Sequence, residues 1–173
     1  MNTKIFGSNR VKVLAAAAAI LMAAIPSFAA TSGTLTLTGT VPAVLDITVT
    51  AQPAASSLDL SVNQANLLVA NVTERSNRKP GYTVTLQSAN AGSGAAFFFK
   101  SADVLNLDML TYTLSYGGSA VTLVGGTALI TDATAKTPSA GVTKDLRISY
   151  SGAASFLNQD AYADTLTFTI TAK

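Results

Sequence analysis

The chain has 173 residues, with 11 lysines and arginines against nine aspartates and glutamates, and it has neither histidine nor cysteine. Ser-His-Asp triads, Cys-His pairs, the usual zinc sites and disulfide bonds are therefore excluded, and the few isolated carboxylates make a paired general acid and base unexpected. We expect a protein that is not an enzyme and that holds no metal or cofactor.

The first 29 residues have the pattern of a cleaved secretory signal peptide. Three basic residues precede an uncharged apolar run over residues 13–25, and Ser27 and Ala29 supply the small residues of a cleavage site. The apolar run is shorter than the roughly 20 residues that span a bilayer. We therefore expect residues 1–29 to be removed after export, with cleavage near Ala29, and the mature chain not to insert into a membrane.

Cleavage would also change the charge of the chain. The three basic residues of the signal leave with it, so eight basic and nine acidic residues remain. This near-neutral balance, without a basic stripe, gives no indication of a nucleic-acid partner. The remaining length suits one domain, which we place at residues 42–173 behind a separate N-terminal segment at 30–41.

From residue 31 onward, apolar side chains alternate with threonine and serine, which is the period of a half-buried β-strand. A short helical turn is predicted within residues 58–66, and Gly117-Gly118 predicts a tight hairpin turn. Many short strands with frequent turns indicate an all-β sandwich or barrel. In chain order, the predicted strands cover residues 33–41, 44–50, 67–72, 81–88, 95–99, 111–116, 120–124, 128–131, 145–150 and 165–171.

Two groups of side chains could bind a sugar or a calcium ion, but each is more simply explained as an ordinary part of the fold. The tyrosines and the run Phe97-Phe98-Phe99 could form a sugar-stacking platform, yet most of them fall on the apolar phase of predicted strands, which favours core packing. Asp103 and Asp108 offer oxygen ligands for calcium, but the glycine and glutamate of a calcium loop are missing. We therefore expect a solvated connection there.

The first predicted strand has two possible uses. Leu35, Leu37, Gly39 and Val41 occupy every second position and so share one face of an extended chain. Such a strand can pair within its own sheet. Alternatively, it can complete the sheet of a neighbouring molecule while its side chains fill pockets there.

Both ends of the mature chain resemble one family. Residues 33–41 are similar to the donor strand of the chaperone-usher pilins and the related spore-coat-U-like secreted subunits, and residues 162–170, with the lead-in Tyr162-Ala163-Asp164-Thr165, are similar to their closing strand. The resemblance implies a single immunoglobulin-like antiparallel β-sandwich that is incomplete until a donated strand fills it. It assigns donor-strand roles to Leu35, Leu37, Gly39 and Val41, and closing-strand or groove roles to Tyr162, Leu166, Phe168 and Ile170.

The resemblance also implies a function. The chain would be a non-enzymatic structural subunit of a fimbrium, secreted through the periplasm to the cell surface and polymerised with like subunits by donor-strand exchange. A periplasmic chaperone and an outer-membrane usher would be its partners during assembly. The alternative is a self-complete secreted or periplasmic β-sandwich module that binds a carbohydrate, a protein or a matrix polymer.

Overall fold

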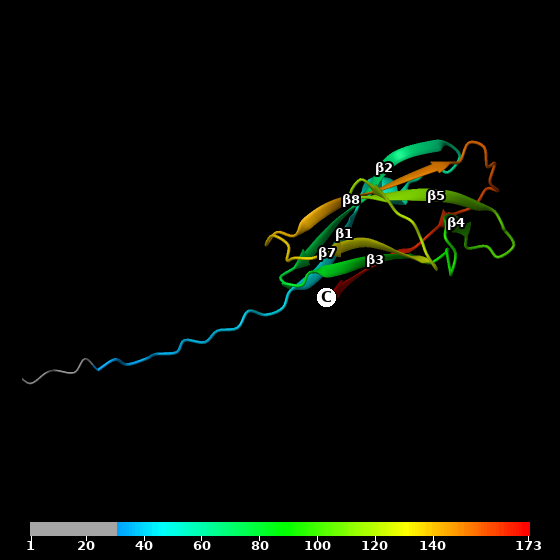
Figure 1. Ribbon diagram of the computed structural model, residues 1–173. Helices are drawn as coiled ribbons and strands as arrows, with labels where there is room; N and C mark the ends of the chain where they lie inside the picture. Colours follow the sequence, from blue (N-terminus) through cyan, green and yellow to red (C-terminus); the bar gives the residue numbers. More distant parts are fainter. Residues whose placement is uncertain (1–30) are drawn as a thin grey trace, which may run out of the picture. The chain divides into compact units, whose positions relative to one another are not determined.

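The computed structural model describes residues 31–173, and the predicted signal peptide lies outside the described residues. The fold is all-β, with two antiparallel sheets packed as an immunoglobulin-like sandwich, which confirms the predicted fold class. In Figure 1, β2, β8, β5 and β4 form the upper layer, and β3 and β7 lie below them. No helix in residues 31–173 is long and apolar enough to cross a bilayer.

The strand order of each sheet follows from the ladder pairs. Within the described residues, the larger sheet has the order β1-β2-β8-β5-β4-β9, with β6 paired to β5, and the smaller sheet has the order β10-β3-β7. The strands are β1 (Leu45–Ala51), β2 (Asn63–Ser76), β3 (Tyr82–Ser88), β4 (Phe97–Ser101), β5 (Met109–Tyr116), β6 (Ser119–Ala120), β7 (Thr127–Ala133), β8 (Val142–Ser151), β9 (Tyr162–Ala163) and β10 (Leu166–Ala172).

Three predicted elements are wrong. Residues 33–41 belong to no strand, because alternation supplies an apolar face but not a partner strand. The helical turn within 58–66 is absent: the side chain of Asp59 accepts the backbone N–H of Ser61, a local bond that competes with helix formation, and β2 begins at Asn63. Only the first residue of the predicted strand 120–124 is in a strand.

The predicted hairpin turn is confirmed. Gly117 and Gly118 have φ angles of +55° and +86° and connect β5 to β6. Positive φ at both central residues is the requirement of the tight turns that match strand twist, and glycine meets it without steric cost.

The core lies between the two sheets. Val72, Val84 and Leu86 are completely buried. Aromatic side chains fill the space around β4 and β5, where the ring of Tyr112 lies 4.5 Å from that of Phe99 between centroids. Core packing is therefore confirmed for most of the tyrosines; those that are buried are Tyr82, Tyr112, Tyr116 and Tyr150.

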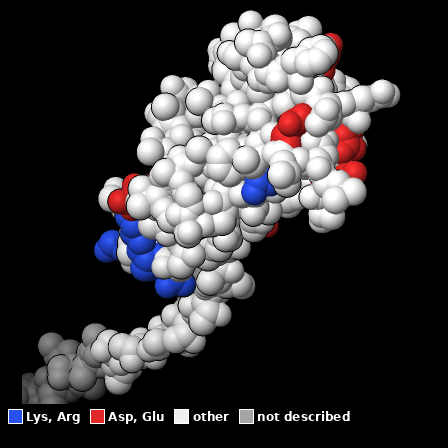
Figure 2. All heavy atoms as spheres, turned by 90° about the vertical axis from the view of Figure 1, so that its right-hand side faces the viewer, with Lys and Arg blue, Asp and Glu red and all other residues white. Residues whose placement is uncertain are grey.

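Charged side chains separate along the sandwich. We call the end with the β2–β3 and β7–β8 connections the base, and the end with the connections at 52–62, 102–108 and 152–161 the tip. Exposed cations outnumber the exposed aspartates at the base, which are Asp46 and Asp132, whereas the exposed charged residues of the tip connections are aspartates. In Figure 2, most blue side chains gather at the lower left of the domain and most red ones at the upper right.

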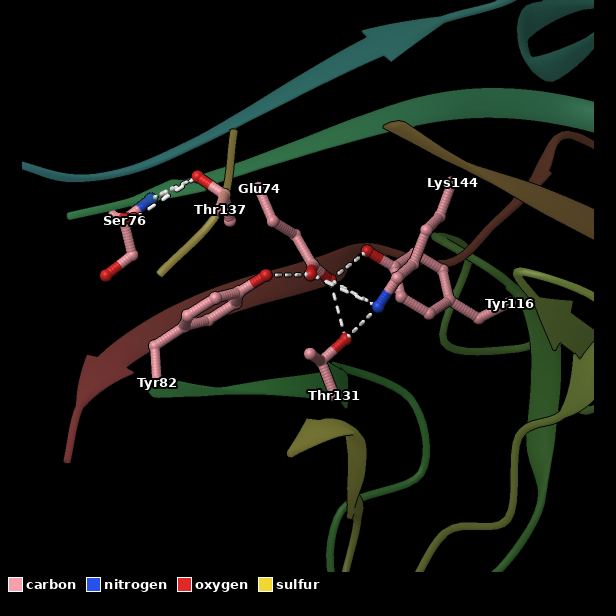
Figure 3. A network of polar contacts seen from close by, with 7 residues as sticks. All are labelled: Glu74, Ser76, Tyr82, Tyr116, Thr131, Thr137 and Lys144. Atoms are coloured by element: carbon pink, nitrogen blue, oxygen red, sulfur yellow. Dashed lines mark hydrogen bonds and ion pairs between the residues drawn. The ribbon is translucent and has the colours of Figure 1, made fainter. Parts of the chain in front are cut away.

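A buried polar cluster joins the two sheets in the half nearer the base. Glu74 of β2 is completely buried, and its carboxylate accepts hydrogen bonds from three hydroxyl groups and from Lys144, as Figure 3 shows. The oxygen–oxygen distances are 2.6 Å to Tyr116, 2.6 Å to Thr131 and 2.9 Å to Tyr82. Because these residues come from β2, β3, β5, β7 and β8, this Glu74 network fixes the sheets to each other.

Candidate functional site: an apolar groove between β1 and β10

The two sheets end in unpaired edges on the same side of the sandwich. β1 pairs with β2 alone and β10 pairs with β3 alone in the described part of the chain. The two edge strands approach each other, but no ladder joins them. Each therefore leaves one row of backbone N–H and C=O groups free to pair with another strand.

An apolar groove lies between these edges. Its floor comes from β2, β5 and β8, and its walls come from β1 and β10. Side chains of the floor are buried, whereas Val49 of the β1 wall is 46% exposed. The core thus reaches the surface along this groove. Its lining residues are Val49, Ala51, Ala55, Leu58, Val69, Ala70, Phe99, Tyr112, Leu114, Leu146, Ile148, Asp164, Thr165, Leu166 and Phe168.

β10 divides into an inner and an outer face. Its apolar side chains are half-buried and face the core, and the threonines between them are exposed. Phe168 lies beside Leu86 of β3 in the ladder, yet Leu86 is completely buried and Phe168 is not. A core position that is completely buried on β3 is therefore partly exposed on the neighbouring edge strand β10.

The polar groups at the tip end of the groove are already bonded to one another. Asp164 accepts hydrogen bonds from the hydroxyl of Tyr112 at 2.6 Å, from the hydroxyl of Ser88 at 2.7 Å and from the backbone N–H of Asn90 at 3.1 Å. Burial, and then the bond to Asp164, raises the pKa of Tyr112 well above its usual value. These hydrogen bonds fix the chain just before β10 to β3 and β5. Because the polar groups bond to one another, the rest of the groove is lined by apolar side chains.

The predicted closing-strand residues do not all lie together. Leu166 and Phe168 line the groove. Ile170 is half-buried on the same face of β10 but is not part of the lining. Tyr162 belongs to β9, which pairs with β4 in the larger sheet, and its hydroxyl donates to the backbone carbonyl of Asn158 at 2.9 Å.

The predicted donor residues are exposed. Leu35, Leu37 and Val41 are each more than 80% exposed. A Cβ atom added at Gly39 would meet no other atom within 4 Å. Residues 31–44 belong to no strand, so the roles of these four residues stay predictions.

Sequence reasoning missed the β1 side of the groove. Val49 and Ala51 form part of one wall, and their alternation only indicated a strand. Whether that strand lies at an edge depends on the order of strands in the sheet.

Comparison of the chain with protein-family models found no match, and comparison with curated protein sequences found no significant match.

Proposed function

We propose that this chain is a non-enzymatic structural subunit of a cell-surface fibre, joined to its neighbours by strand donation. One observation carries the proposal: the sandwich has an unfilled apolar groove between β1 and β10, and the same chain has an exposed segment with apolar side chains at every second position. The groove has unpaired strand edges and partly exposed apolar walls, and the segment has apolar side chains and no partner strand within residues 31–173.

The segment and the groove match in length and chemistry. β10 has seven residues, and the alternating apolar positions run from Leu35 to Val41, which is also seven residues. A strand inserted there would bond to the free edge of β10. Its side chains would cover Val49 and Phe168, which are partly exposed without it.

An open groove also favours the assembly partners that the resemblance implies. Exposed core side chains beside unpaired strand edges are prone to aggregation. A subunit exported in this form would need a periplasmic chaperone to cover the groove before an outer-membrane usher brings in the next subunit. The predicted signal peptide supplies the route to the periplasm.

The self-complete module is less well supported. It requires the first predicted strand to pair within its own sheet, whereas residues 31–44 belong to no strand. The groove is apolar along its length and its polar end is internally bonded, so it lacks the convergent polar groups of a carbohydrate site.

Deletion of residues 31–41 tests the proposal. We expect the deleted chain to be exported and folded, because the sandwich begins at Leu45, but not to form fibres. A pair of point variants places a leucine side chain on one face of the segment, at Gly39, or on the opposite face, at the neighbouring Thr38. Gly39→Leu should slow assembly far more than Thr38→Leu. Normal fibres from the deleted chain would contradict the proposal.

A further inference from the structure

Exposed charge at the base is mainly positive, and exposed charge at the tip is negative. The β2–β3 and β7–β8 connections carry the exposed cations Arg78, Lys79 and Lys136, although Asp46 and Asp132 are also exposed at this end. The tip carries Asp59, Asp103 and Asp160, which are exposed, and Asp108, which is half-buried. None of these three cations and four tip aspartates forms an ion pair within residues 31–173, where the ion pairs join Glu74 to Lys144, Asp145 to Arg147 and Asp132 to Lys173. Both ends therefore have charge available for a partner.

Hydrogen bonds favour the ionised form of two of the tip aspartates, Asp59 and Asp160. Hydrogen bonds from the side chain and the backbone of Ser61 keep the pKa of Asp59 below its usual value. Hydrogen bonds from Ser101 and Asn106 do the same for the pKa of Asp160. These two carboxylates thus stay ionised at neutral and mildly acidic pH.

Large apolar side chains are exposed among these aspartates. Val104, Leu105 and Leu107 of the β4–β5 connection are each more than 80% exposed, and Phe156 of the β8–β9 connection is fully exposed. Exposed large apolar side chains on a polar surface are a feature of protein contact sites. The tip therefore combines negative charge with exposed apolar side chains.

The base has a hollow with the complementary chemistry. Ala43 and Pro80 supply apolar surface beside Val41, the last donor position, and Arg78, Lys79 and Lys136 surround it with positive charge. Asn77, the remaining lining residue, ties this hollow to the chain that leads into β1. Its side chain accepts the backbone N–H of Val44 and donates to the carbonyl of Pro42, both at 2.8 Å.

The connection between the segment and the sandwich is short. Four residue steps separate Val41 from Leu45, where β1 begins at the base, so an extended chain spans at most about 14 Å between them. β10 runs from the tip to the base, since Leu166 pairs with Ser88 and Ala172 with Tyr82. A donated strand antiparallel to β10 would therefore leave the groove at the tip and bring its own subunit's base there.

We infer that the tip of one subunit docks on the base of a second copy of this chain, with the acidic apolar tip seated against the cationic hollow. The inference rests on the proposed function, because strand donation is what brings the two ends together. The opposite strand direction would place two bases together, where like charges repel. A head-to-tail contact between different surfaces also extends into an open fibre instead of closing into a dimer.

Charge reversal at each end tests this contact. The base variant is Arg78→Glu with Lys79→Glu, the tip variant is Asp59→Lys with Asp103→Lys, and the third chain combines all four substitutions. The measurement is the initial rate of association of the mature chain, followed by light scattering at low ionic strength. We expect each pair to slow association about tenfold or more, because steering between opposite charges is lost. The fourfold variant should recover most of the rate.

Three controls separate charge from other effects. Asp59→Asn with Asp103→Asn keeps the acceptor oxygens that hold the tip connections and should have an intermediate rate. Arg147→Glu changes charge on the outer face of the larger sheet, away from both ends, and should have little effect. Added salt should slow the wild-type chain and leave the slow variants nearly unchanged.

Binding of a synthetic peptide of residues 31–43 separates this inference from the proposed function. All variants should bind the peptide as the wild-type chain does, because the groove retains its lining. Failure of the wild-type chain to bind it would overturn both proposals. Normal peptide binding together with unchanged association rates in both reversed variants would overturn the tip-to-base contact alone, and so would a fourfold variant as slow as its parents.

Discussion

The Glu74 network and the groove are two places where the sheets meet, and they differ in how the core is closed. At the network, a completely buried carboxylate has hydroxyl and ammonium partners from both sheets. At the groove, apolar side chains of β1 and β10 are partly exposed and no ladder joins the two strands. The network closes the contact between the sheets with groups of the chain itself, whereas in the proposed function the groove is closed by a strand from another subunit.

The Glu74 network and the groove also differ in how strictly they specify what packs against them. A buried carboxylate is tolerated only when its hydrogen-bonding capacity is satisfied, so the Glu74 network admits few alternative arrangements of the strands. Apolar surface in the groove is not directional and accepts any chain that presents side chains at the right spacing. The Glu74 network thus specifies the arrangement of the strands, and the proposed function assigns association between subunits to the groove.

Removing the buried carboxylate should have the largest effect on stability. Glu74→Leu leaves the hydroxyls of Tyr82 and Tyr116 without their acceptor and Lys144 without its counter-charge. We expect a loss of about 3–5 kcal/mol in the free energy of unfolding, measured by urea denaturation. Glu74→Gln, which keeps the shape and one acceptor oxygen, should cost less. A Glu74→Leu chain as stable as the wild type would mean that the network does not hold the sheets together.

Matched leucine truncations compare the sealed core with the groove. Leu86→Ala removes a completely buried side chain and should cost about 2–5 kcal/mol. Leu166→Ala removes a half-buried one at the open edge and should cost less than half as much in the isolated chain. The order should reverse for binding of the peptide of residues 31–43, which only Leu166→Ala should weaken strongly. Equal losses of stability for Leu86→Ala and Leu166→Ala would show that the apolar face of β10 is already fully buried in the isolated chain.

The free energy of unfolding at alkaline pH should depend on tyrosines of the Glu74 network and of the groove end. Burial, and then hydrogen bonds to carboxylates, raises the pKa of Tyr82, Tyr112 and Tyr116 above the usual value near 10. Above about pH 10 the unfolded chain loses these protons while the folded chain keeps them, so stability falls as pH rises, by about 1.4 kcal/mol per pH unit for each tyrosine.

Tyr112→Phe separates the contribution of the groove end from that of the network. It should flatten the decline above pH 10 by about 1.4 kcal/mol per pH unit, because one of the tyrosine protons that the folded chain retains is removed. Below pH 9 the variant and the wild-type chain should show the same dependence on pH. A slope unchanged by the substitution would indicate that Tyr112 ionises as readily in the folded chain as in the unfolded one.

Sequence reasoning succeeded where the period of two is regular. β3, β5 and β10 alternate without interruption and were predicted to within about two residues. β2 is much longer than its predicted range, because register shifts between Gln64 and Leu67 and between Leu68 and Ala70 interrupt its alternation, and Asn66 has a φ of +54°.

The site was less predictable than the strands. Leu166 and Phe168 could be assigned to a groove only through the resemblance at the C-terminal end. The openness of the groove depends on β1 and β10 being edges, which is set by strand order and not by any local pattern. Glu74 was not predicted as a core residue, since a lone charge on a strand normally faces solvent and its partners lie 8 to 70 positions away in the sequence.

The most direct test of the account is hydrogen exchange in β10. The chain lacking residues 31–41 would be mixed with the synthetic peptide of residues 31–43, and exchange of each backbone amide would be followed by NMR. We predict that the β10 amides not bonded to β3 become protected, and that a peptide carrying Gly39→Leu protects them much less. Tight binding without added protection in β10, or no binding at all, would contradict the claim that this edge receives a donated strand.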